Sequence, residues 1–106
     1  MIYVSTGGYK NVAFTDIIRL LSKENINAFE LSGGLYSKST LEDLILLSTS
    51  YSLALHNYFP PAKKPFVFNL GTLNESIASK SIDHAKTAIE HASKIKSKYY
   101  SFHAGF

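Results

Sequence analysis

The chain has 106 residues, 45% of them hydrophobic, which is enough for one modest hydrophobic core, and we expect a single domain over residues 1–106. It contains no cysteine, so disulfides and thiolate chemistry within the chain are excluded, and a bound metal would need histidine, carboxylate or carbonyl ligands. The net charge of +3 comes from lysines spread along the chain, a distribution too dispersed to indicate a nucleic-acid-binding surface.

The first third of the chain alternates between strand and helix patterns. Residues 2–5 are a short β-type run that ends in the glycine-rich turn Thr6-Gly7-Gly8. From Asn11 onward the period changes to that of a helix, with apolar side chains at Phe14, Ile17, Ile18 and Leu21. Residues 27–31 again have a strand pattern, and the next glycine-rich turn, Ser32-Gly33-Gly34, closes it. Both turns could present backbone N–H groups to a phosphate, but neither matches a phosphate-binding motif, and tight strand-to-helix turns explain them more simply.

The middle of the chain predicts a second helix and a third strand. The helix has Ser39 or Thr40 as its N-cap and Glu42 and Asp43 in its first turn, where carboxylates stabilise the positive end of a helix. Its expected apolar stripe is Leu41, Leu44, Ile45 and Ser48. The strand covers residues 52–55 and ends at His56, after which three prolines, Pro60, Pro61 and Pro65, prevent regular structure.

A long helix and a fourth strand complete the pattern. The helix follows residues 66–70, and we expect its buried face to contain Ile77, Ile82, Ala85, Ile89, Ala92 and Ile95. His84 and His91 lie beside that face, and we expect both to point to solvent. Residues 99–102 then form the last strand. No run reaches the roughly 18 apolar residues of a membrane span and the N-terminus lacks a signal-peptide pattern, so we expect a soluble cytoplasmic protein without membrane contact.

The repeated strand–helix alternation predicts an α/β fold with a parallel sheet, because each crossover between strands is a helix. Two architectures use this repeat, an open doubly wound sheet and the closed eight-stranded barrel. In both, functional sites lie at the carboxyl ends of the strands. Polar side chains should therefore gather at those ends if the chain has a site.

Such residues are present at each predicted strand end. They are Ser5, Thr6 and Gly7 for the first strand, Glu30 and Ser32 for the second, His56 and Asn57 for the third and His103 for the fourth. Neighbouring strand ends are about 5 Å apart, so the two histidines would reach one metal ion if the third and fourth strands are adjacent. The simpler alternative is that both are hydrogen-bonded histidines at the rim of the sheet.

The second half of the chain resembles a known superfamily. The pattern is a histidine that ends strand three (His56), an Asn-Leu pair (Asn69-Leu70), a late helical alanine (Ala92) and an H-x-G after strand four (His103-Ala104-Gly105). It resembles the N-terminal half of the xylose-isomerase-like barrels, the sugar phosphate isomerase and epimerase superfamily, which also contains the zinc-dependent apurinic-site endonucleases. Members of it usually have a glycine where the long helix ends, but this chain has Lys96 there.

The resemblance implies a partial (βα)8 TIM barrel of about three βα units plus a fourth parallel strand, because a complete barrel takes roughly 250 residues. It implies His56 and His103 as ligands of a divalent metal ion, zinc or manganese, although two histidines also suit cobalt and nickel. Glu30 and Asn69 become the candidates for contact with a sugar or sugar phosphate. No catalytic residue is assigned, because in the superfamily the catalytic carboxylates come from later strands.

Three functions follow as expectations. The first is a fragment of a metal-dependent sugar isomerase or epimerase that is inactive alone. The second is a fragment of an apurinic-site endonuclease, although nucleic-acid binding is not expected from dispersed lysines. The third is a non-catalytic half barrel that associates with itself. An open half barrel has unpaired edge strands, so we expect either a homo-oligomer or pairing with the missing C-terminal half of the barrel as its partner.

Overall fold

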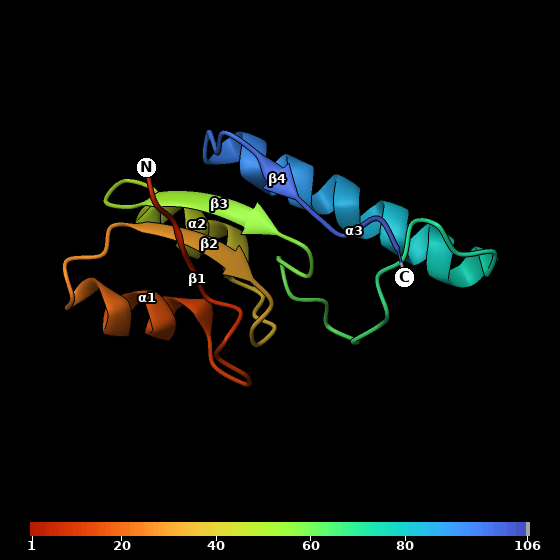
Figure 1. Ribbon diagram of the computed structural model, residues 1–106, viewed down its shortest axis with the longest axis horizontal. Helices are drawn as coiled ribbons and strands as arrows, with labels where there is room; N and C mark the ends of the chain where they lie inside the picture. The colour runs from red at the N-terminus through yellow and green to blue at the C-terminus, as the bar shows by residue number, and fades with distance from the viewer. Residues whose placement is uncertain (106) are drawn as a thin grey trace.

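The computed structural model describes residues 1–105. Strands and helices alternate along the chain (Figure 1) in the order β1 (Val4–Ser5), α1 (Phe14–Ser22), β2 (Ala28–Ser32), α2 (Thr40–Leu47), β3 (Ser52–His56), α3 (Glu75–Lys94) and β4 (Tyr100–Ser101). The strands form one sheet in the order β1-β2-β3-β4, and every neighbouring pair is parallel. The predicted α/β class and the predicted element order are confirmed, with β1 and β4 shorter than expected.

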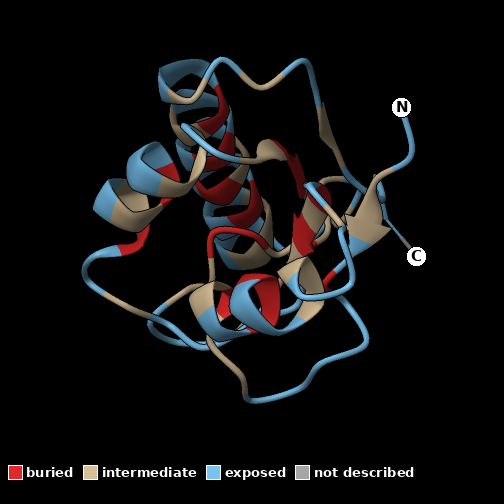
Figure 2. Ribbon diagram, turned by 90° about the vertical axis from the view of Figure 1, so that its left-hand side faces the viewer, coloured by how far each residue is buried: buried red, intermediate tan, exposed pale blue. Residues whose placement is uncertain are grey.

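One face of the sheet is covered by all three helices. Every second residue of β2 and β3 points to this face, and these side chains pack with apolar side chains from each helix in one core. The buried members of this core are Phe14, Ile18, Phe29, Leu31, Leu44, Leu53, Leu55, Phe59 and Ala92. Figure 2 shows the buried stretches where the sheet meets the helices. Because a single cluster contains side chains of α1, α2 and α3, no helix of residues 1–105 covers the opposite face.

The opposite face of the sheet has small and polar side chains. The strand register places Ser5, Glu30 and Ala54 in one row across β1, β2 and β3. A second row, nearer the carboxyl ends, contains Ser32, His56 and Ser101. We call this surface, defined by these two rows together with Ala28 and Ser52, the open face. The two faces of the strands therefore separate the large apolar side chains of the core from the polar side chains of a candidate site.

The buried face of α3 differs from the predicted one. Ile82 and Ile89 are 46% and 56% exposed, whereas the side chains that face the rest of the protein are Ser81, His84, Ala88 and Ala92. Only Ala92 belongs to the predicted stripe of buried residues. The small side chains let the helix lie close to the chain beneath it, and the Ser81 hydroxyl accepts a hydrogen bond from the Asn69 N–H at 2.9 Å. The expectation that His84 points to solvent is wrong, because this side chain is buried.

Helix α2 also buries fewer apolar residues than expected. Leu44 is fully buried, but Ile45 is 46% exposed, so the predicted stripe is wrong at this position. Thr40 takes its place in the interior and donates from its hydroxyl to the carbonyl of Ser37 at 2.9 Å. Ser39 is the N-cap residue, but its side chain bonds to Asp43 instead of to a backbone N–H.

The end of α3 shows how the chain accommodates Lys96 at a position where the superfamily that it resembles usually has glycine. This residue has φ of 54°, the left-handed conformation that usually selects glycine. The N–H of Ser97 donates to the carbonyl of Ala92 at 2.9 Å, and that of Lys96 donates to the carbonyl of Ser93 at 3.1 Å. These two bonds are those of a Schellman motif. The helix thus ends in the left-handed form although the residue is lysine.

None of the helices in residues 1–105 combines the length and apolar character needed to cross a membrane.

Candidate functional site

The two histidines predicted as metal ligands lie side by side. Their ring centroids are 5.2 Å apart and their planes make an angle of 82°. His56 is the last residue of β3, and His103 follows β4, which pairs directly with β3. His56 is half-buried, whereas His103 is exposed. The parallel pairing of adjacent strands thus brings together residues that are 47 positions apart in the sequence.

A hydrogen bond fixes the orientation of the His56 ring. Its Nδ1 lies 2.9 Å from Oγ of Ser101, the residue opposite it on β4. In the tautomer in which Nδ1 donates to this hydroxyl, Nε2 keeps its lone pair. Metal-binding histidines usually have such a partner on the nitrogen that does not bind the metal. The His56 environment therefore suits a ligand that binds through Nε2.

Asn57 connects the two histidine segments. It follows His56 in a left-handed conformation, with φ of 47°, which asparagine tolerates better than most residues. Its N–H donates to the carbonyl of Ser101 at 2.8 Å, and its Oδ1 accepts from the N–H of His103 at 3.4 Å. This residue extends the β3–β4 pairing beyond the strands and places the backbone of His103 next to His56.

The carbonyl of Asn57 also has two side-chain donors. His84 Nε2 donates to it at 2.8 Å and the Tyr100 hydroxyl donates to it at 3.1 Å. Burial lowers the pKa of His84, with the bond to Asn57 opposing that change, and burial raises the pKa of Tyr100 to about 12. Both side chains are therefore neutral donors near pH 7. Together they hold the end of β3 against α3 and β4.

Asn69 lies against the H-x-G segment instead of on the open face. The N–H groups of Leu70 and Gly71 donate to the carbonyl of Ala104 at 3.1 and 3.2 Å, and Asn69 Oδ1 accepts from the Gly71 N–H at 2.9 Å. A Cβ atom on Gly105 would lie 2.6 Å from Asn69 Oδ1, a separation that would force a shift. The two short motifs of the resemblance are thus in contact. The predicted contact of Asn69 with a substrate stays a prediction.

Glu30 lies on the open face, one row further from the carboxyl ends than His56. Burial raises the pKa of the Tyr99 hydroxyl, and the charges of Tyr3 and Glu30 raise it further. Tyr3 and Tyr99 meet edge to face, with ring centroids 5.8 Å apart. Of the four predicted site residues, the structure brings only His56 and His103 into direct contact with each other.

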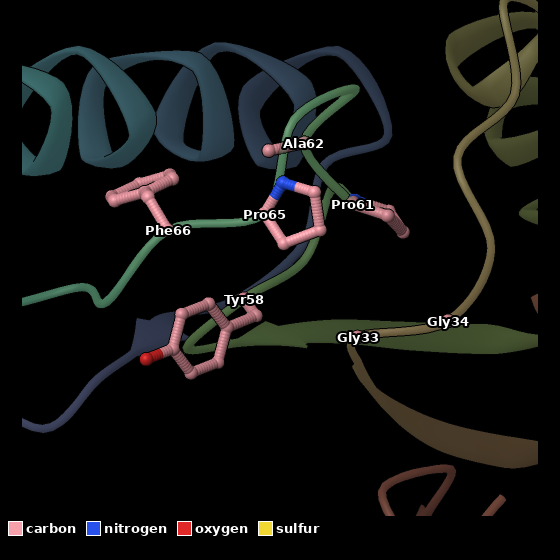
Figure 3. Close-up of a pocket in the computed structure, with 7 residues that line it drawn as sticks. All are labelled: Gly33, Gly34, Tyr58, Pro61, Ala62, Pro65 and Phe66. Atoms are coloured by element: carbon pink, nitrogen blue, oxygen red, sulfur yellow. The ribbon is translucent and has the colours of Figure 1, made fainter. Parts of the chain in front are cut away.

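A cavity of about 220 Å³ opens near the ends of β2 and β3 (Figure 3). Its walls are Gly33 and Gly34, which directly follow β2, and Tyr58 with Pro61, Ala62, Pro65 and Phe66 of the following loop. Figure 3 shows the Tyr58 ring on one side and Pro65 and Phe66 on the other. Gly33 and Gly34 have φ of 74° and 116°, and a Cβ atom on Gly34 would lie 3.2 Å from the carbonyl oxygen of Val12. These glycines therefore serve a tight turn, as expected, and also leave space.

The histidine pair provides two donors suited to a borderline metal such as zinc, cobalt or nickel. Within residues 1–105 no group of three or more histidine, aspartate and glutamate side chains is close enough to hold a metal ion. The pair therefore fits part of a metal site, and further ligands would have to come from water or from residues beyond the four described strands.

Comparison with known proteins found no matching family model, no matching curated protein and no matching solved structure.

Two parts of this region were missed by sequence reasoning. His84 has hydrophobic neighbours only in three dimensions, where its ring packs edge to face against Phe66 and Phe68 at 5.8 and 5.5 Å. The signal was the row of small residues, Ser81 and Ala88, on the same side of the helix as His84. The role of Asn57 had a weaker signal, namely an asparagine directly after a strand, where left-handed residues are common.

Proposed function

We propose that residues 1–105 form one half of a βα barrel of the sugar isomerase and epimerase type, in which His56 and His103 bind a divalent metal ion. The observation that carries the proposal is the contact between these two imidazole rings at the carboxyl ends of neighbouring parallel strands. Two further features support it: the strands lie in the sheet in the same order as in the sequence, and the helices cover only one face of the sheet. In a barrel the helices lie outside and the uncovered face of the sheet lines the interior.

The residues of this half would have distinct tasks. His56, held by Ser101, and His103 would be metal ligands, and Glu30 on the open face would bind a substrate hydroxyl. A metal ion bound there would polarise the hydroxyl and carbonyl oxygens of a sugar or sugar phosphate. Glu30 is the one carboxylate on the four described strands. The acid and base that move a proton between adjacent carbons would therefore come from other strands, and we expect no turnover by this chain alone.

Self-association is a second candidate function, favoured by the edge at β4. No strand of residues 1–105 pairs with the outer side of β4 or of β1. Beside β4 lies a groove of about 350 Å³ lined by Ile89, Tyr99 and Phe102, all of which are exposed, together with Ala92, Ser93, Ser97 and Tyr100. An unpaired edge with apolar side chains next to it is a template for another strand. A second copy that offered its β1 edge would extend the sheet without any change in strand direction.

A metal titration of the untagged protein tests the main proposal. Co²⁺ would be added while visible absorption and the side-chain NMR signals of the histidines are recorded, first for the unaltered chain and then for His56→Ala and His103→Ala. We expect each substitution to weaken metal binding by at least about tenfold. His91→Ala is the matched control, because His91 lies on α3 away from the pair and should leave the affinity unchanged.

The results separate the candidates. Equal loss of affinity in the His91→Ala control, or no loss in either variant of the pair, would refute the metal site.

Light scattering on the same samples would show a mass of two or more chains if self-association is the function. A duplex with an abasic site, added at low and high salt, tests the endonuclease alternative, which requires salt-sensitive binding. Turnover of aldose or ketose phosphates by the chain alone would contradict the assignment of the catalytic carboxylates to other strands.

A further inference from the structure

A cavity larger than the one beside β2 lies between the β3–α3 loop and α3. Its volume is about 430 Å³, within the range typical of small-molecule sites. The loop contributes residues 60–66, α3 contributes four residues and Tyr36 completes the wall. The lining contains none of the residues assigned to the metal or the sugar, namely Glu30, His56, Asn69 and His103. Four loop residues, Pro61, Ala62, Pro65 and Phe66, also line the smaller cavity of Figure 3, so the loop separates the two spaces.

The charge around this cavity is positive. Lys63 and Lys64 approach from the loop and Lys80 from α3, and Asp83 is the single acidic residue of the lining. Among residues 1–105 the only ion pair is Arg19–Asp16, so none of these three lysines is paired with a carboxylate. Three ammonium groups and one carboxylate leave an excess of positive charge at one opening. That excess is complementary to an anion.

The walls between the charged groups are apolar and rigid. Pro60, Pro61 and Pro65 line the loop side, and the ring of Phe66 lies beside them. Prolines have a fixed backbone φ, so little conformational freedom would be lost when a ligand binds. A flat or compact apolar group would remove these surfaces from water, which a small inorganic ion would not do.

His84 adds one polar group to the lining. Its Nε2 donates to the Asn57 carbonyl at 2.8 Å, so this nitrogen carries the proton and Nδ1 is an acceptor in the neutral ring. The residue is only 8% exposed, and every fully buried side-chain nitrogen of residues 1–105 has a hydrogen-bond partner. Nδ1 has no such partner among these residues, so this atom is not fully buried. Because His84 lines the cavity, we infer that Nδ1 is accessible from it. It can accept from a hydroxyl or amide of a ligand.

From this arrangement we propose that the cavity is a binding site for a small organic anion with an apolar, ring-like body and a hydroxyl group. The anionic group lies against Lys63, Lys64 and Lys80, the body lies against the prolines and Phe66, and the hydroxyl donates to His84 Nδ1. The site is separate from the histidine pair and does not depend on a metal ion there.

Three related probes test each element of the proposal by NMR titration of the backbone amides. The probe 4-hydroxybenzoate has the anion, the ring and the hydroxyl; its methyl ester lacks the negative charge, and benzoate lacks the hydroxyl. We expect 4-hydroxybenzoate to shift the amide signals of Ala62, Lys63, Lys64, Phe66 and residues 80–87 and to bind more weakly as salt is raised. Benzoate should bind about two- to tenfold more weakly, the effect of one hydrogen bond.

Two triple variants provide the matched comparison. Lys63, Lys64 and Lys80 would all be replaced by glutamine, and the control would carry the same replacement at Lys10, Lys23 and Lys94, which are exposed and do not line the cavity. Both lose three positive charges, but only the first should weaken 4-hydroxybenzoate binding, by at least about tenfold. Circular dichroism would confirm that each variant is folded.

Several outcomes would overturn the proposal. Binding of the methyl ester as tight as that of the acid would remove the role of the lysines, as would equal losses in the two triple variants. Equal binding of benzoate and 4-hydroxybenzoate would remove the role of His84. The double variant His56→Ala, His103→Ala keeps this site, so its unchanged affinity for 4-hydroxybenzoate would show that the anion site stands even where the metal proposal fails.

Discussion

The two faces of the sheet are made by the same strands and have opposite chemistry. On β2, Phe29 and Leu31 are fully buried beneath the helices, whereas Glu30 between them and Ser32 after them lie on the open face and are half-buried. On β3, Leu53 and Leu55 are buried on the helix side. Strands enclosed on both faces usually read as continuous apolar runs, and these alternate instead. The alternation places the large apolar side chains of β2 and β3 on one face, whereas the open face buries only the small Ala28 and Ala54.

This difference explains where stability and chemistry should reside. The covered face removes large apolar side chains from water, and such burial is the main favourable contribution to folding. The open face contributes little apolar area, since its strands carry alanine, serine, one glutamate and one histidine there. It is therefore free to carry the polar groups of a site, and substitutions on the two faces should have different effects.

The largest effect is expected from one pair of adjacent residues on β2. Phe29→Ala removes a fully buried ring and should lower the free energy of unfolding by about 3–5 kcal/mol. Glu30→Ala, on the opposite face, should change it by less than about 0.5 kcal/mol. Urea unfolding followed by circular dichroism measures both. If Phe29→Ala does not fold, Phe29→Leu provides the comparison with a loss of about 1.5 kcal/mol. Equal losses for Phe29 and Glu30 variants would mean that both faces contribute to the core.

A smaller effect is expected on α3, where the buried face of the helix differs from the one predicted from the sequence. Ala88 is fully buried, so Ala88→Leu would overpack the contact between α3 and the sheet and lower the unfolding free energy by about 1–3 kcal/mol. Ile89→Ala removes an apolar side chain that is 56% exposed and should cost no more than about 0.5 kcal/mol. The same denaturation experiment decides. A larger loss for Ile89→Ala than for Ala88→Leu would restore the stripe expected from the sequence.

The sequence predicted the strands better than the faces of the helices. A strand has a period of two, so the apolar residues of β2 and β3 indicate the buried side without ambiguity. Helix α3 has apolar residues on more than one side, and the choice between them depends on what lies beneath the helix. Here the neighbours are the Asn57 carbonyl and the Asn69 N–H, which favour His84 and Ser81 over isoleucine. Such tertiary hydrogen bonds leave no periodic signal in the sequence.

The proximity of His56 and His103 was predicted from the sequence, but the residues that hold them in place were not. The principle that carboxyl ends of parallel strands meet at one edge was enough to bring His56 and His103 together. Asn57 has a left-handed conformation and joins the end of β3 to Ser101 and His103 by hydrogen bonds. This conformation could not be predicted from residue type alone. Lys96 is the opposite case, because the position favours glycine and the left-handed helix end persists with lysine. Hydrogen bonds of the helix end offset a local preference of about 1 kcal/mol there.

The smallest effect concerns the shape of the open face. Tyr3 precedes β1 and Tyr99 precedes β4, yet their rings meet at 5.8 Å although three strand spacings, about 14 Å, would separate those strands in a flat sheet. On β2 and β3, which lie between these strands, Ala28 and Ala54 are small and almost fully buried on this face. Side chains from the two edges of the sheet therefore meet above its open face.

A double-mutant cycle with Tyr3→Ala, Tyr99→Ala and the combined variant measures this contact. We expect a coupling free energy of about 0.5 kcal/mol, the lower end for an aromatic pair, because Tyr99 is 43% exposed. Tyr9, which is exposed and makes no contact with Tyr99, provides the control pair, with additive effects expected. Additive effects for Tyr3 and Tyr99 as well would mean that the rings do not meet in solution. The two edges of the sheet would then have no contact above the open face, while the histidine pair on β3 and β4 would be unaffected.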